Sequence, residues 1–393
     1  MDDLSHGNPV PFFSQSRPGP AFRTNDGSNC DHNINTSTVE GRRQAYSLLL
    51  SRGLLRIALP LPAGAEFTVQ SANNPYGCNE TSTLSMYRRP LPAANLRFLS
   101  TVMWDGREST APTTQKITYV PGQTPMNILL ADLGQQAMDA TTGHAQGATP
   151  TAAQVQDIVN FEMSLMTAQA VDYRAGLLNQ GGVTGGPVAL ATQQSFIGIN
   201  DSFPPSFGFN PTGAAFNPNI FNLFSSWKTA VLPARASIAR GEAVFNSKPI
   251  TLSGVAGIND VAGLPTSFSG TCGTCHDSLN VGNHSVSAPL NIGVGDVTSP
   301  LDVSYLPVFT LVNIATNETV QTTDPGRALV TGKWADIGKV KGPILRGLAS
   351  RAPYFHNGSA TTLSDVVTFY EKRFNISFTL QEKADLVAFL NSL

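Results

Sequence analysis

The sequence predicts a mainly α-helical protein of two domains with long irregular loops. Its 393 residues suffice for two hydrophobic cores of ordinary size. Three segments with helical apolar spacing open with a capping box, in which a Thr is followed three residues later by Gln, Asp or Glu; these boxes begin at Thr151, Thr362 and Thr379. The 35 Gly and 27 Pro residues predict many turns and long connections between such helices.

The chain before the first capped helix is less regular. Residues 1–40 are polar and rich in Gly, Pro and Asn, which predicts loop. Apolar spacing over residues 39–59 predicts a short helix that runs into an extended segment ending at Pro60. Residues 85–107 carry large side chains without a clear period, so we expect a packed loop there. The helix after Thr151 then closes the first domain.

The predicted domain boundaries follow the composition of the chain. Residues 1–175 form the first domain, and residues 176–232, rich in Gly and Pro, form a connection over the surface. The second domain covers residues 233–393 and starts with an amphipathic helix near Ala234. Residues 277–345 alternate short apolar runs with Gly, Pro and Asn, which predicts loops and short helices. The second domain is therefore expected to be α-helical.

Charge and cysteine usage narrow the class of protein. A net charge of −2 with 13% charged residues gives no reason to expect nucleic acid or an anionic membrane surface as partner. There is no apolar run of about 18 residues, so we expect no membrane-spanning helix. Cys30 and Cys78 lie in polar, turn-forming surroundings, which favours a disulfide in an oxidising compartment; two unrelated free thiols are the alternative.

The other two cysteines belong to the segment Thr271-Cys272-Gly273-Thr274-Cys275-His276-Asp277. Its pattern, C-x-x-C-H, is the attachment pattern of a c-type haem, in which both Cys bind the haem covalently and the His becomes the proximal iron ligand. A zinc site normally needs a second Cys or His pair, and a thioredoxin-like pair belongs near a βαβ unit; the sequence indicates neither. The motif predicts haem c and redox chemistry at iron.

The sixth iron ligand is not a Met of the haem's own domain, because no Met follows Met166. The candidates after the motif are His284, His356 and Tyr370. Tyr370 lies one turn after two Val residues, so its phenol projects from an apolar helix face; it is an iron ligand or a core tyrosine. A phenolate or a second imidazole stabilises ferric iron relative to a thioether.

The two histidines, His284 and His356, have possible roles other than binding the iron. His284 lies in a turn-like stretch, which favours a position at the surface or behind the ligands. His356, in Ala-Pro-Tyr-Phe-His-Asn-Gly-Ser, is a ligand, a hydrogen-bond partner of a haem propionate, or a contact of a neighbouring loop.

Three further motifs point to a family. The ending Lys341-Gly-Pro-Ile-Leu-Arg-Gly-Leu-Ala-Ser-Arg-Ala-Pro-Tyr-Phe-His-Asn-Gly-Ser, the segment Asp324-Pro-Gly-Arg, and Trp104-Asp-Gly-Arg resemble bacterial di-haem cytochrome c peroxidases and MauG-type enzymes. The similarity runs from about residue 80 to 175 and from 233 to 393.

The resemblance implies two cytochrome-c-like α domains, each with a haem, and a tryptophan between them that matches Trp104. Tyr370 matches the axial position, where MauG-type proteins carry Tyr, and therefore becomes the preferred ligand beside His276. Gln136 corresponds to a glutamine near the peroxide site, and His144 stands where a catalytic glutamate is expected. His144 either takes over the proton transfer that helps to cleave the O–O bond or is an exposed loop residue. Arg346 and His356, both in the matched ending, are expected at the cofactor.

Two departures from the family stand out. The C-x-x-C-H of the first domain, expected upstream of Trp104, is absent, so a segment with the peroxidatic haem is expected to be missing there. The calcium site between the domains is in doubt, because Arg89 replaces the expected Asn.

The resemblance implies an exported, periplasmic oxidoreductase that passes electrons from a small redox protein through its haem towards hydrogen peroxide, although no export signal is visible. The alternatives are a one-haem electron carrier or redox sensor, and a MauG-like modifier of a protein side chain. The expected partners include a second copy of the chain as a homodimer.

Overall fold

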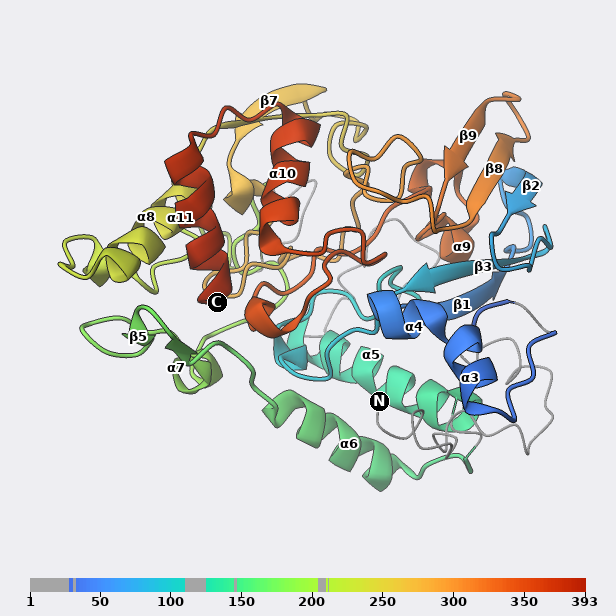
Figure 1. Cartoon of the computed structure of the whole chain (residues 1–393), viewed down its shortest axis with the longest axis horizontal. Coiled ribbons are helices and arrows are strands. Elements are labelled where there is room, and N and C mark those ends of the chain that lie inside the picture. The colour runs from blue at the N-terminus through green and yellow to red at the C-terminus, as the bar shows by residue number, and fades with distance from the viewer. Residues whose placement is uncertain (1–27, 31–32, 110–124, 145–146, 204–209, 211) are drawn as a thin grey trace.

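The computed structural model describes residues 28–30, 33–109, 125–144, 147–203, 210 and 212–393. It is 32% helix and 15% strand, so the prediction of a mainly α-helical fold was wrong. Figure 1 shows helices α8, α10 and α11 together at one side of the molecule, strands β1, β2, β3, β8 and β9 at the other, and α5 and α6 along one edge.

The helices are α3 (Val39–Ala45), α4 (Ser47–Arg52), α5 (Pro125–Asp139), α6 (Ala152–Ser164), α7 (Pro187–Ala191), α8 (Pro233–Ser247), α9 (Ala328–Thr331), α10 (Leu363–Phe374) and α11 (Leu380–Asn391). Shorter turns of 3₁₀ helix are η2 (Leu96–Phe98), η4 (Ser225–Trp227), η5 (Cys272–Thr274), η6 (Trp334–Asp336) and η7 (Leu348–Ser350), and η3 (Ala140–His144) is a π-helix. The strands are β1 (Leu55–Pro60), β2 (Phe67–Asn73), β3 (Thr83–Arg88), β4 (Val171–Asp172), β5 (Gly176–Leu177), β6 (Ile250–Ser253), β7 (Ser267–Gly270), β8 (Val308–Asn313) and β9 (Thr319–Thr322).

The capped helices form as predicted. The side chains of Thr151, Thr362 and Thr379 each accept a hydrogen bond from the main-chain N–H three residues on. The side chain of that later residue in turn accepts a hydrogen bond from the main-chain N–H of the Thr. Both bonds satisfy N–H groups that a helix start leaves without partners. The extended segment expected to end at Pro60 is β1, which follows α3 and α4.

The strands are where the sequence prediction failed. β1 pairs with β3, and β2 pairs with β8, which continues to β9, all antiparallel. Residues 308–322, predicted as loop and short helix, form the β8–β9 hairpin, and the first residues of the predicted loop 85–107 complete β3. In β8, buried and half-buried residues alternate, the pattern of a strand with one face on a core.

Sheet β2-β8-β9 joins residues from both predicted domains. Phe67 pairs with Asn313 at one end of the β2–β8 ladder and Asn73 with Val308 at the other. The domain boundaries at residues 175 and 233 stay a prediction.

Helices α8 and α11 form the centre of the C-terminal helical layer. A Cβ on Gly241 would clash with the main-chain oxygen of Asp385, so only Gly allows the two helices to approach this closely. Arg240 of α8 binds Asp385 of α11 through two hydrogen bonds of 2.7 and 2.9 Å. The layer is thereby fixed above the segment that carries the Cys motif.

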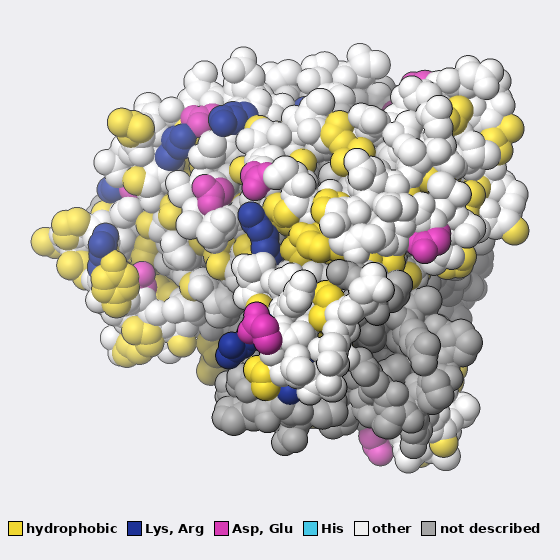
Figure 2. Space-filling view, turned by 45° about the vertical axis from the view of Figure 1, so that its right-hand side comes forward, with side chains coloured by type: hydrophobic (Ala, Val, Ile, Leu, Met, Phe, Trp, Pro, Cys, Tyr) yellow, Lys and Arg dark blue, Asp and Glu magenta, His cyan; other side chains and the backbone are white. Residues whose placement is uncertain are grey.

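Cys30 and Cys78 form a disulfide across 48 residues, as the sequence analysis favoured. In the chain-entropy model, a closed loop of this length stabilises the fold by about 4 kcal/mol. None of the helices in the described part of the chain is both long and apolar enough to cross a lipid bilayer. Charged side chains are sparse and scattered on the face shown in Figure 2.

Candidate cofactor site

A cavity of about 630 Å³ lies against the Cys motif and is lined mostly by apolar side chains. Cys272, Cys275 and His276 form part of its wall, and Tyr370 of α10 lines it as well. The cavity extends to Trp104 and to residues of α5, so both halves of the chain contribute to it. A largely apolar cavity with a few polar groups is typical of a cofactor site.

The motif opens with a short turn. Thr271 caps η5 through reciprocal hydrogen bonds with Thr274, and the His276 N–H donates to the Cys272 carbonyl at 3.1 Å. Cys272 and Cys275 are both free, and burial raises the pKa of each thiol to about 12. Burial in an apolar wall disfavours dithiol exchange, which needs an accessible thiolate. No group of three or more His, Cys, Asp or Glu in the described ranges is arranged to hold a metal ion.

The His276 ring is oriented by a main-chain carbonyl. Its Nδ1 lies 2.6 Å from the Gly282 oxygen, so Nδ1 carries the proton and Nε2 keeps its lone pair. Gly282 has φ +78° and a Cβ there would press on Phe221, which explains why glycine occupies this position. Burial lowers the pKa of His276, although the Gly282 bond raises it in part. The imidazole is neutral and ready to bind a metal.

Tyr370 faces the free nitrogen of His276. Its hydroxyl oxygen lies 3.5 Å from His276 Nε2, and its ring packs against Phe355, Phe369 and Phe374. Burial, followed by the nearby Cys275 and Cys272, raises the pKa of the phenol. Two metal-binding atoms therefore lie 3.5 Å apart in the wall of an apolar cavity that two thiols also line. This donor set fits a covalently bound haem with His276 and Tyr370 as iron ligands.

His356 takes no part in this facing pair. It is buried, and its Nε2 lies 3.6 Å from a carboxylate oxygen of Asp324. Its ring centre is 6.1 Å from that of Trp104, whose indole N–H donates to the Arg89 carbonyl at 2.8 Å. Burial lowers the pKa of His356 to about 4, against the effect of Asp324, so the ring is neutral at physiological pH. His356 also lines the cavity, so its predicted roles as ligand, propionate partner or loop contact stay predictions; the contacts that the structure displays are those with Asp324 and Trp104.

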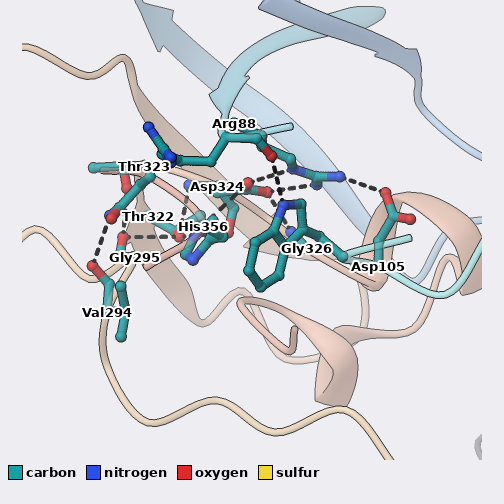
Figure 3. A network of polar contacts seen from close by, with 12 residues as sticks. Arg88, Asp105, Val294, Gly295, Thr322, Thr323, Asp324, Gly326 and His356 are labelled. Atoms are coloured by element: carbon teal, nitrogen blue, oxygen red, sulfur yellow. Dashed lines mark hydrogen bonds and ion pairs between the residues drawn. The ribbon is translucent and has the colours of Figure 1, made fainter. Parts of the chain in front are cut away.

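A buried ion-pair network supports His356 and Trp104 (Figure 3). Arg88, at the end of β3, donates to both oxygens of Asp324 at 2.7 and 2.8 Å and to Asp105 at 2.5 Å. Burial by itself raises the pKa of both carboxyls, but Arg107 and Arg88 bring that of Asp105 below its usual value, and Arg88 does the same for Asp324. Both Asp residues are therefore ionised, and the network holds the Trp104 segment against the C-terminal half.

The structure places the four remaining candidate residues differently from one another. Gln136 of α5 lines the cavity. His144 ends η3, and its side chain lies outside what the structure describes. Arg346 does not line the cavity; it is buried and donates to the main-chain oxygens of Leu393 and Asn280. His284 is buried behind the motif, with Nε2 4.0 Å from a carboxylate oxygen of Asp277, so it is not a surface residue.

Sequence reasoning missed the cations of the cavity wall. Arg89, Lys341 and Arg351 line the cavity, and Lys341 is almost completely buried. Lys341 and Arg351 both lie inside the matched ending, but a charged residue in a motif gives no sign of whether its side chain points inward. The sequence also gave no indication that the Gly282 carbonyl accepts a hydrogen bond from His276.

Part of the chain is similar in sequence to curated cytochrome c peroxidases. It is 37% identical over 81 residues to the cytochrome-c peroxidase IdrP1 of Pseudomonas sp. (strain SCT), covering 18% of this chain and 21% of that protein. It is 41% identical over 76 residues to the cytochrome c551 peroxidase of Nitrosomonas europaea, covering 19% of this chain and 23% of that protein. The predicted resemblance to cytochrome c peroxidases is confirmed. The chain matches only about a fifth of the length of these relatives.

No family model matches the chain. Among solved structures, a MauG-like protein associated with microbial copper homeostasis is 17% identical with a TM-score of 0.38, over 84% of this chain and 77% of that one. The Kuenenia stuttgartiensis hydrazine synthase is 12% identical with a TM-score of 0.35, over 86% of this chain and 76% of that one. TM-scores this low do not establish a shared fold.

Proposed function

We propose that this protein is a c-type haem oxidoreductase of the di-haem cytochrome c peroxidase type, which passes electrons towards hydrogen peroxide. The observation that carries this proposal is the alignment of four groups on one cavity: the two thiols of the C-x-x-C-H motif, His276 Nε2 and, 3.5 Å away, the Tyr370 hydroxyl. The partial match to cytochrome-c peroxidases supports the same class. The haem, when bound, supplies one-electron exchange at iron.

The residues of the chain hold this cofactor in defined ways. Cys272 and Cys275 would tether it and His276 would bind the iron through Nε2, while the Gly282 carbonyl fixes the orientation of the ring. Tyr370, held within the aromatic cluster of α10, would supply the second ligand. The apolar wall excludes water and keeps the phenol protonated until a metal displaces its proton.

Trp104 serves as a relay for electrons between the cavity and the N-terminal half. It lines the cavity and is held on two sides, by the Arg89 carbonyl at its indole N–H and by the Lys341 N–H at its own carbonyl, 2.9 Å away. Gln136 contributes a neutral amide to the same cavity, a group that orients a small polar substrate such as peroxide. We place the protein in the periplasm, with a small redox protein as electron donor and a second copy of the chain as homodimer partner.

Rapid mixing with peroxide tests this function. Reduction of H₂O₂ to two waters takes two electrons and two protons, so the proposed function predicts repeated oxidation where a second haem is bound, and a chain with one haem is expected to be oxidised slowly and without turnover. Stopped-flow absorbance of the reduced protein after mixing with H₂O₂, together with haem content per chain, measures both quantities. One haem with fast, repeated oxidation would contradict the need for a second haem. The absence of any haem would remove the proposed function.

One specific observation favours a second candidate, a one-haem electron carrier or redox sensor. The printed sequence contains a single C-x-x-C-H, and no second motif precedes Trp104. Exchange of electrons with a small redox protein at one haem per chain, with no peroxide reduction, is the result that this candidate predicts.

Replacement of Tyr370 by Phe is expected to change the electronic spectrum of the oxidised protein, because it removes the only phenol that faces His276 within the described residues. The reduction potential is expected to rise, since an oxygen ligand favours ferric iron. Tyr305→Phe is the matched control: its hydroxyl donates to the Asn357 carbonyl at 2.9 Å and does not line the cavity. A Tyr370→Phe spectrum equal to that of the wild type excludes Tyr370 as ligand.

A further inference from the structure

The cavity wall carries an excess of positive charge. Its lining includes six cationic side chains and one carboxylate, that of Glu162; the cations are Arg56, Arg88, Arg89, Arg107, Lys341 and Arg351. Arg88 and Arg107 are neutralised by Asp105 and Asp324. Arg56 donates to the Ser28 carbonyl at 2.9 Å. The remaining three cations, Arg89, Lys341 and Arg351, are the subject of this inference.

These three cations hydrogen-bond main-chain carbonyls and, in the part of the chain that the structure describes, no carboxylate pairs with them. Lys341 Nζ donates to Thr101 O at 3.1 Å, and Arg351 donates to Ile344 O at 3.2 Å. Arg89 donates to the carbonyl of Arg351 at 3.0 Å, which places these two residues side by side. An ammonium group has three donors, so Lys341 keeps two for another acceptor.

Burial of these charges is costly unless something compensates them. Burial lowers the pKa of Lys341 to about 7 and that of Arg351 to about 10, and the positive charge of Arg351 lowers the pKa of Lys341 further. Burial also lowers the pKa of Arg89. Cationic side chains without a carboxylate partner in a largely apolar wall suit an anionic group of a ligand.

Two of the three cationic residues contact Trp104 through their main chains. The Lys341 N–H donates to the Trp104 carbonyl, and the Trp104 indole donates to the carbonyl of Arg89. We infer that Arg89, Lys341 and Arg351 form a carboxylate-binding site that takes the propionate groups of the haem beside Trp104. This inference rests on the proposed function, because it names the anionic part of the cofactor. Two propionates carry two negative charges, which the three cations match with one positive charge to spare.

The midpoint potential of the haem tests the site without reference to peroxidase activity. Lys341→Met keeps the length of the side chain and removes its charge. The potential is expected to fall, because loss of a nearby cation destabilises the reduced, more negative state. Lys341→Arg restores the charge and is expected to restore the potential. Lys228→Met, which removes an exposed lysine, is the control and leaves the potential unchanged. Arg351→Gln provides a second variant if Lys341→Met does not fold.

Added acetate distinguishes haem propionates from a free carboxylate as occupant. With propionates bound, acetate leaves the wild-type potential unchanged, and the carboxylate bands in redox-difference infrared spectra shift in Lys341→Met. A potential that responds to acetate in the wild type but not in Lys341→Met identifies a site for free anions and overturns the inference. Charge-removing variants with wild-type potential and infrared bands also overturn it. These results leave the proposed function intact, whereas a wild-type protein without haem removes the function itself.

Discussion

The double variant Cys272→Ala/Cys275→Ala is expected to carry no covalently bound haem. Both thiols line the cavity, both are free, and burial keeps them in the thiol form that addition to a vinyl group uses. Without thioether links, any haem that enters is held by its iron ligands and apolar contacts alone. Extraction with acidified acetone should then remove all colour from the variant, while the wild type keeps its haem on the denatured chain.

The other two cysteines provide a matched control for this experiment. Cys30→Ala/Cys78→Ala removes the same number of sulfur atoms but lies away from the cavity lining. We expect this variant to keep its full haem content and to lose up to about 4 kcal/mol of stability, as the chain-entropy model gives for the loop it opens. Single variants at Cys272 or Cys275 should retain one thioether each, with a shifted pyridine haemochrome band. Covalent haem in the double variant at positions 272 and 275 would contradict the proposed attachment.

The cofactor site was largely predictable because its signals are local. The C-x-x-C-H pattern places two thiols and an imidazole within five residues, and η5 brings all three to one wall. The capping box at Thr362 defines the start of α10, and from there helical spacing directs Tyr370 inward. That Tyr370 faces His276 needed the family resemblance as well, since an apolar helix face does not distinguish a ligand from a core tyrosine.

The sheets were not predictable by the same reasoning, because their paired strands are far apart in the sequence. β2 and β8 pair across more than 200 residues of sequence, and neither strand has an apolar run that identifies its partner. Arg88 is read from the sequence as one of two adjacent arginines in a loop. In the structure it ends β3 and binds Asp324, 236 residues away. Long-range pairs of this kind determine both the strand content and the charge of the cavity wall.

Arg88→Met is expected to lower the free energy of unfolding by about 3–5 kcal/mol at neutral pH, the usual cost of removing one partner of a buried ion pair. The Arg88 guanidinium is buried and satisfies two carboxylates, each almost without exposure to solvent. Asp105 keeps Arg107 at 3.0 Å, but Asp324 is left with the Gly326 N–H at 2.7 Å and the neutral His356, neither of which carries a positive charge. Urea unfolding followed by circular dichroism measures the loss. The exposed pair Arg43–Glu40 is the control, and Arg43→Met should change little.

The pH dependence of this loss separates an electrostatic cause from a packing defect. In the wild type the Asp105 and Asp324 pKa values are below their usual range, so the stability these groups contribute is complete above the unfolded value of about 3.9 and disappears as pH falls through their folded values. In Arg88→Met, Asp324 loses the largest effect that opposes burial and keeps only those of His356 and the Gly326 N–H, so we expect burial to raise its pKa above the unfolded value of about 3.9. Protonation then relieves the buried charge, so the gap between variant and wild type should narrow from about pH 7 to about pH 4.5. A gap of constant size over this range would show that lost packing around Arg88, and not an uncompensated carboxylate, destabilises the variant.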